Sequence, residues 1–301
     1  MNIAHLTYQA DISHWTWTIA AFLWFVGIAG MGSVAYYFVR GKALGITIFA
    51  SLVIGLLFVV SHLSRWWNLP IALFNAVLEW SFNFQSWMFW GFLILSVHLV
   101  FALVVLIRHL DFLRNYSLLR MIGDVADNNL FLGVLGAVGF MATVYSGFLI
   151  AAASGIPFWN TALIPVLWVI SASVAAVALI ELYHVFGWTD EKAASIGMRL
   201  GLGLDVMKLL AILAFLYIAA TVGTIGAQYS AGLMISGDLA GFTWIGIIGI
   251  GILLPMILAV FSMKFGERKP VMLVSSIAAL VGVFMLRATI LLAGVWEPLV
   301  V

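Results

Sequence analysis

Histidine is the side chain in this sequence best suited to proton chemistry, because it titrates near neutral pH and can accept or donate a proton. His14 stands just before the first apolar run of the chain, and His62 ends the second one. Ionisable groups inside or at the edge of apolar segments are energetically expensive, so they indicate function by default. These two histidines are the first candidates for a functional site, and the surrounding segments decide whether they can meet.

The stretch from Ser61 to Trp90 joins the second apolar run to the third, and it is rich in tryptophan and phenylalanine. It is too polar to cross a membrane. Tryptophan favours the membrane–water interface because its ring is apolar while its N–H group requires a hydrogen-bond acceptor. The stretch therefore predicts the floor of a site at a membrane surface; the alternative interpretation is an interfacial anchoring loop.

The composition is that of an integral membrane protein. Of 301 residues, 65% are hydrophobic and 8% are charged, against about 25% charged in soluble domains. Hydrocarbon admits only helices and closed barrels, and no apolar run shows the alternation of barrel strands. We expect an all-α fold with one polytopic domain, residues 1–301, and eight helices in two four-helix bundles. At about 20 apolar residues per crossing, the predicted spans are 16–39, 44–63, 86–110, 127–152, 163–187, 203–224, 242–262 and 271–292.

The basic residues predict the orientation of these spans. Arg65 lies at the end of the second span, and ten other basic residues lie in or beside the loops after spans one, three, five and seven: Arg40, Lys42, Arg108, Arg114, Arg120, Lys192, Arg199, Lys264, Arg268 and Lys269. The positive-inside rule makes those four loops cytoplasmic. Both termini and the His62 end are then expected to face the periplasm of a bacterial inner membrane. The N-terminus lacks the positive region of a secretory signal peptide.

The chain contains no cysteine, which excludes disulfides, Cys-ligated iron–sulfur clusters and thioether-attached haem within it. Electrons that pass through this protein must therefore come from another subunit. The net charge of +1 argues against a nucleic-acid partner, and we predict no metal site.

The remaining polar residues divide by predicted depth. His98 falls near the middle of the third span, where a hydrogen bond to a neighbouring helix is the favoured interpretation. Asp205 and Lys208 are three residues apart on a helix and can pair. The periplasmic side collects His14, His62, Arg65, Tyr145 and Arg287, and the cytoplasmic side Glu181, His184, Asp205 and Lys208. The cytoplasmic group is either a self-neutralised cluster or a relay for proton entry.

Four stretches of the chain resemble the NrfD/PsrC-like membrane subunits of polysulfide-reductase and dimethyl-sulfoxide-reductase type complexes. They are HWTWTIAAFLWFVGIAGMGSVAY at 14–36, SHLSRWWNLPIALFN followed by SWMFWG within 61–91, YSGFLIAAASGIPFWNTALIPVLWVISASVAA at 145–176, and LRATILLAG at 286–294. The third stretch is the most specific. The sequence departs from the family pattern after the second span, where Ser64-Arg65-Trp66-Trp67-Asn68-Leu69-Pro70 replaces a Gly-Arg-Pro-like turn.

The resemblance implies a haem-free anchor subunit that binds menaquinone or ubiquinone near the periplasmic face. It also implies a ferredoxin-like iron–sulfur subunit docked on that face, and a molybdopterin catalytic subunit that performs the terminal chemistry. The quinone-site positions of the family fall on His14, His62 and Tyr145. Arg65, Trp87, Asn160 and Arg287 are candidates for supporting polar or aromatic contacts.

The chemistry of these residues agrees with that implication. A quinone headgroup needs hydrogen-bond donors at its two carbonyls and an exchangeable proton nearby, and histidine and tyrosine supply both. We place the partner subunit over 64–85 and 153–162, where large aromatic residues and few charges suit a buried interface.

Two alternatives stay open. Histidine pairs at matching depth, His14 with His62 or His109 with His184, could bind haem axially, as in a cytochrome b-type anchor. A secondary transporter is the other alternative, although the sequence shows no internal repeat.

Overall fold

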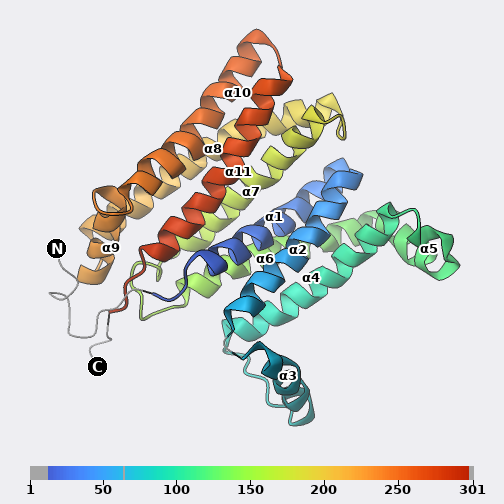
Figure 1. The fold of residues 1–301 in the computed structure, drawn as a ribbon, viewed down its shortest axis with the longest axis horizontal. Helices are drawn as coiled ribbons and strands as arrows, with labels where there is room; N and C mark the ends of the chain where they lie inside the picture. Colours follow the sequence, from blue (N-terminus) through green and yellow to red (C-terminus); the bar gives the residue numbers. More distant parts are fainter. Residues whose placement is uncertain (1–12, 64, 298–301) are drawn as a thin grey trace.

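The computed structural model describes residues 13–63 and 65–297, and its regular elements are helices that run side by side (Figure 1). Eight are long and apolar enough to cross a membrane, which confirms the eight-span all-α prediction. They are α1 (Trp17–Val39), α2 (Lys42–His62), α4 (Trp87–His109), α6 (Asn129–Ala151), α7 (Leu163–Val185), α8 (Glu191–Thr221), the continuous η5 (Phe242–Leu253) and α10 (Leu254–Phe265), and α11 (Lys269–Leu292).

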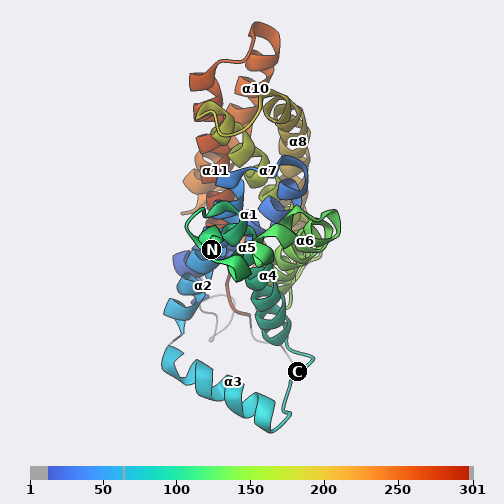
Figure 2. The ribbon, with the colours of Figure 1, turned by 90° about the vertical axis from the view of Figure 1, so that its right-hand side faces the viewer.

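Shorter helices connect the long ones. The 3-10 helix η2 (Trp66–Asn68) and α3 (Leu69–Leu78) follow α2, and together they project from the body of the protein (Figure 2). Between α4 and α6 lie η3 (Leu113–Asn115), α5 (Ser117–Asp124) and η4 (Val125–Asp127), and α9 (Ile225–Ile235) follows α8. The sequence predicted loops at all three places.

The long helices form two groups, and the helices of each group follow one another in the sequence. In the first, α1 and α4 each pack against both α2 and α6; in the second, α7 packs on α8 and α11, and α11 also packs on η5 and α10. Helix α1 additionally contacts α7 and α11. It is therefore shared between the two groups, at the centre of the molecule.

Glycines of α1 permit this central position. A Cβ atom at Gly30 would lie 2.5 Å from the carbonyl oxygen of Gly139 in α6, and one at Gly27 would lie 2.8 Å from the guanidinium of Arg287 in α11. Gly32 faces Ile48 of α2 in the same way, at 3.3 Å. Small residues let helix backbones approach closely, so these glycines allow α1 to pack against three other helices.

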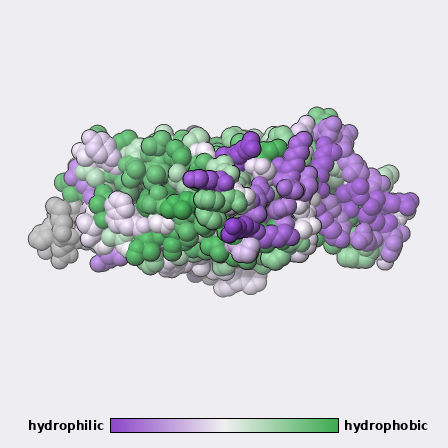
Figure 3. Space-filling view, turned by 90° about the horizontal axis from the view of Figure 1, so that it is seen from above, coloured by the Kyte–Doolittle hydropathy of each residue, from purple (hydrophilic) through white to green (hydrophobic). Residues whose placement is uncertain are grey.

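The surface divides along the helix axes. A broad apolar band covers the middle of the molecule, and hydrophilic residues gather at the end where α5 lies (Figure 3). We call this the basic end, because the ten basic residues of the predicted cytoplasmic loops lie in or beside the helix connections there. The opposite end carries α3, and Ser13 N donates to the carbonyl of Gly294 at that end, 3.0 Å away. The first and last parts of the described chain thus meet at the α3 end.

One helix boundary differs from the prediction. Helix α8 begins at Glu191, not near 203, because the Asp190 side chain caps it by accepting from the backbone N–H of Ala193. Asp205 consequently lies fourteen residues inside the helix, about 21 Å from its start at 1.5 Å per residue. Asp205 and Lys208 therefore lie well within the helix and do not open it.

Candidate functional site

His62 is the last residue of α2, and it contacts the first turn of α1. Its Nδ1 atom lies 3.2 Å from Thr18 Oγ1, and its side chain is half-buried. This contact fixes the ring orientation and leaves Nε2 as the atom available to a ligand. Helices α1 and α2 therefore meet at His62, at the α3 end.

Tyr145 reaches the same end from α6. Its side chain is buried and packs directly against the backbone of Gly91 in α4, where any added Cβ atom would overlap the tyrosine hydroxyl. One helical turn away on each helix, Trp87 and Phe148 stack with ring centroids 5.1 Å apart and an interplanar angle of 5°. Gly91 was not among the predicted site residues. Its signal was its place in the motif SWMFWG, directly after the aromatic segment.

His14 lies in the extended segment that leads into α1, and its side chain is exposed. Ser13 ties this segment to Gly294, and Trp15 stacks on Trp159 with centroids 6.0 Å apart. Among the described residues, no hydrogen bond joins His14 to His62 or Tyr145. The structure therefore brings α1, α2, α4 and α6 together at the α3 end, with His14 at a bend in the segment before α1.

The supporting residues have different surroundings. Arg65 is exposed, and the Asn160 side chain donates to the carbonyl of Ala151, 2.8 Å away, at the end of α6. Arg287 is fully buried between α1, α7 and α11; it donates to Ser171 Oγ at 3.0 Å and to the Trp168 carbonyl at 3.3 Å. Asn160 and Arg287 thus bind backbone and neighbouring helices, away from His62.

A second polar group lies inside α7, α8 and α11. Lys208 Nζ lies 2.7 Å from Asp205 Oδ1, and both side chains are buried, which confirms the predicted pairing. Glu181 is also buried, and its Oε2 atom lies 3.4 Å from Ser276 Oγ. Glu181 and Asp205 both line a cavity of about 20 Å³, which is large enough for one water molecule.

Lys208 also contacts the main chain of the π-helical segment η5. Lys208 Nζ donates to the carbonyl of Gly251, 2.8 Å away, in the π-helical η5. In an α-helix this carbonyl would accept from the residue four positions later, but that residue is Pro255 and has no N–H. Pro255 thus removes the α-helical donor to this carbonyl, which accepts from the buried ammonium group of Lys208.

His184 does not belong to this group. Its Nδ1 atom lies 3.0 Å from the carbonyl oxygen of Thr189, in the connection between α7 and α8. The structure thus brings together Glu181, Asp205 and Lys208 of the four predicted cytoplasmic residues.

A wide apolar groove of about 810 Å³ lies near the basic end, bordered by α1, α7 and α8. Its walls are mostly aliphatic, and Trp188, Asp190 and Lys192 stand at its mouth. None of the predicted quinone residues lines it.

The sequence is similar to known proteins along nearly its whole length. A protein-family model described as "Polysulphide reductase, NrfD" matches residues 6–297. The sequence is 27% identical to protein NrfD of Escherichia coli and 27% identical to one of the chains of the Wolinella succinogenes polysulfide reductase, in both cases over 93% of this sequence and 94% of the relative. It is 25% identical to one of the subunits of the Mesobacillus selenatarsenatis selenate reductase, over 87% of this sequence and 69% of that protein. This multi-pass membrane protein belongs to the NrfD polysulphide reductase family.

Proposed function

We propose that this protein is the membrane anchor subunit of a respiratory reductase complex, and that it exchanges electrons and protons between a quinone and an iron–sulfur partner subunit. Two of the similar proteins are named as a chain of polysulfide reductase and a subunit of selenate reductase. The terminal substrate is then converted in another subunit. Menaquinone and ubiquinone are the candidate quinones.

One observation carries the proposal. His62, held by Thr18, and Tyr145, packed on Gly91, lie at the same end of α1, α2, α4 and α6. These are the two side chains of the described site that can donate a hydrogen bond to a carbonyl and also exchange a proton. Trp87 is 40% exposed beside them, so its ring is available to line a slot for an isoprenoid tail.

The reaction assigned to the site balances in either direction. A quinone reduced here takes two electrons from the partner's cluster and two protons, which form two O–H bonds on its oxygens. His62 and Tyr145 hold the two carbonyl oxygens by hydrogen bonds and orient the ring. His62 can also hold a proton at Nε2 while Nδ1 stays bonded to Thr18.

The projecting segment of η2 and α3 is the proposed docking surface for the iron–sulfur subunit, on the face predicted to be periplasmic. Large side chains of this segment and of the turn after it are exposed: Trp66 by 56%, Phe74 by 64% and Trp80 by 78%. Aromatic residues of this kind are enriched in the cores of protein interfaces. The 153–162 loop contributes less than its sequence indicated, because Phe158 and Trp159 are buried against the chain's own helices.

The buried group of Glu181, Asp205 and Lys208 is the proposed route by which additional protons cross part of the membrane. The water-sized cavity between the two carboxylates supports this role, since a water molecule there can carry a proton from one to the other. His184 lies three residues after Glu181 on α7, and its contact is with the connection between α7 and α8.

The test measures binding of a fluorescent quinol analogue to the purified protein and to His62→Ala. Quenching of the analogue's fluorescence reports the binding. Saturable binding that is lost in His62→Ala but kept in His184→Ala would support a quinone site at the α3 end. Binding unchanged in His62→Ala would exclude His62 from the site. An absorption spectrum of the same sample tests the cytochrome b-type alternative, which requires a Soret band.

A further inference from the structure

His98 is a fully buried histidine in the middle of α4 that the proposed quinone site does not use. Its Nε2 atom lies 2.8 Å from Ser33 Oγ, and Ser33 Oγ itself donates to the carbonyl of Ala29 at 2.9 Å. A serine hydroxyl has a single hydrogen, so Nε2 must be the protonated nitrogen and must donate to Ser33. Nδ1 is then a bare proton acceptor, and it has no hydrogen-bond partner in the described structure.

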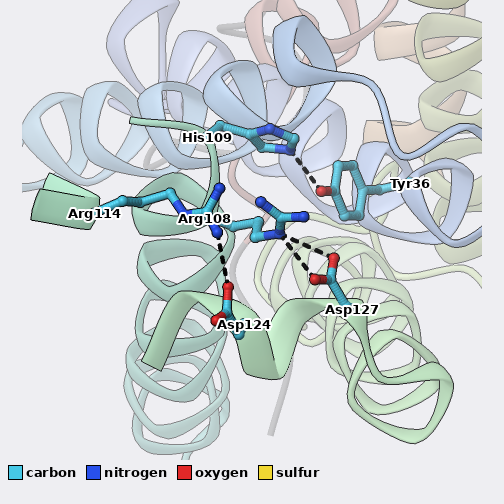
Figure 4. Close-up of polar contacts among 6 residues, drawn as sticks. All are labelled: Tyr36, Arg108, His109, Arg114, Asp124 and Asp127. Atoms are coloured by element: carbon cyan, nitrogen blue, oxygen red, sulfur yellow. Dashed lines mark hydrogen bonds and ion pairs between the residues drawn. The ribbon is translucent and has the colours of Figure 1, made fainter. Parts of the chain in front are cut away.

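A second pair of titratable groups lies three helical turns further along α4. His109 Nε2 lies 2.6 Å from the hydroxyl of Tyr36, which is buried in α1 (Figure 4). His109 is half-buried and packs on Gly45 of α2, where an added Cβ atom would lie 2.7 Å from the imidazole ring. This pair stands at the basic end, between buried helix packing and the surface.

Charged residues surround this pair at the surface. Arg108 Nε donates to Asp127 at 2.9 Å, and Arg114 donates to Asp124 at 3.0 Å (Figure 4). Both ion pairs are solvent-accessible. Protons can therefore reach His109 from water at this end.

The spacing along α4 aligns these stations with the quinone site. Gly91, the residue that Tyr145 packs against, lies seven residues before His98, and His98 lies eleven residues before His109. These intervals are close to two and three helical turns. The three positions thus share one face of α4. On α1, Ser33 and Tyr36 are three residues apart and also share a face. Side chains of α1 thus contact α4 at two levels, Ser33 at His98 and Tyr36 at His109.

We propose that the helices that hold the quinone site also contain their own proton relay, with His109 and Tyr36 as its opening at the basic end and His98 Nδ1 as its inner station. This inference rests on the proposed quinone site. The protons that the quinone itself takes up or releases pass through this relay. Glu181, Asp205 and Lys208 carry only the additional protons.

The relay works without breaking the contact that holds the ring. His98 takes a proton on Nδ1 and later releases the same proton, while Nε2–H stays bonded to Ser33. The stations are about 10 Å and 16 Å apart along the helix axis, so water molecules must bridge the gaps between them. When quinone is reduced, two electrons come from the iron–sulfur partner and two protons enter from the basic end; oxidation reverses both flows.

The test uses the native complex reconstituted into vesicles with a pH-sensitive dye inside. An impermeant reduced viologen outside gives up electrons without protons, and it reaches only complexes whose partner subunit faces outward. The lumen should then lose at least two protons per quinone reduced. In His98→Gln, whose amide can still donate to Ser33 but cannot exchange a proton, quinone reduction and lumen alkalinisation should both fall about a hundredfold, while quinol-analogue binding is unchanged.

A second variant covers the case in which His98→Gln does not fold. Tyr36→Phe removes only the hydroxyl at the opening and should slow both rates. Tyr183→Phe is its matched control, because Tyr183 is also a tyrosine near the basic end with a side-chain partner, Thr47, and it should behave as wild type.

The outcomes separate this inference from the proposed function. If His98→Gln reduces quinone and alkalinises the lumen at wild-type rates, His98 only joins two helices and the relay is refuted. If wild type reduces quinone without any change in lumen pH, the protons enter at the α3 end, which also refutes the relay but leaves the quinone site intact. If wild type neither binds the analogue nor reduces quinone, the proposed function itself fails.

Discussion

The contact between Gly91 and Tyr145 offers the sharpest test of the proposed quinone site. In Gly91→Ala the new methyl group would overlap the Tyr145 hydroxyl and the ring carbon that bears it. The ring is buried and must therefore move away from α4. We expect weaker binding of a quinol analogue, because the ligand requires the hydroxyl in its original place.

The magnitude follows from the smaller of two costs. A lost neutral hydrogen bond is worth about 0.5–1.5 kcal/mol, which alone predicts a loss of affinity of about two- to twelvefold for Tyr145→Phe. Returning the displaced ring against the new methyl group would keep this hydrogen bond but would cost overpacking strain of about 1–3 kcal/mol. The protein takes the less costly of the two courses, so Gly91→Ala should bind about two- to twelvefold more weakly than wild type, as Tyr145→Phe does.

The assay is the same fluorescence titration, with a thermal unfolding curve to verify folding. Gly133→Ala is the matched control: this glycine lies in α6, and an added Cβ atom there would meet no atom within 4 Å. In a Tyr145→Ala background, Gly91→Ala should have no further effect on binding. Wild-type affinity in a folded Gly91→Ala protein would show that Tyr145 takes no part in binding.

Three further predictions concern the interior. Glu181→Gln should lower the number of protons taken up per electron in vesicles and leave the rate of quinone reduction unchanged; an unchanged proton ratio would remove Glu181 from the route. Lys208→Met leaves Asp205 buried without its partner and should destabilise the protein by about 3–5 kcal/mol, whereas adding Asp205→Asn should recover most of this loss in thermal unfolding. Gly30→Ala should lower the free energy of unfolding by about 1–3 kcal/mol, because its methyl group overlaps α6. Gly32→Ala has more room, and its free energy of unfolding should stay within about 1 kcal/mol of wild type. Equal melting temperatures of the two variants would contradict the role of Gly30 in packing α1 on α6.

The sequence predicted those features that depend on local composition. Eight apolar runs predicted the spans, and the three-residue spacing predicted the ion pair of Asp205 and Lys208. The favoured interpretation of His98, a hydrogen bond to a neighbouring helix, is also confirmed by Ser33.

Features that depend on which side chains meet across helices could not be predicted. The role of Gly91 depends on its contact with Tyr145, which lies in another helix, so the sequence alone could not indicate it. The free carbonyl of Gly251 follows from Pro255, but its use by Lys208 requires the packing of α8 on η5. The early start of α8 was missed because hydropathy falls near Lys192 and Arg199, whereas the cap at Asp190 sets the boundary.

Arg287 and Gly30 together have a mechanical consequence. Helix α1 is fixed to α6 by backbone contact at Gly30, and a single helical turn earlier Gly27 meets the buried guanidinium of α11, which is itself bonded to α7. Transporters that alternate access rock one helix bundle against the other. Here such a motion would break the hydrogen bonds of the buried Arg287 to α7. We therefore expect the long helices to move as one rigid frame. Such a frame suits the proposed function, in which only electrons, protons and a lipid-soluble carrier that enters from the side need to move.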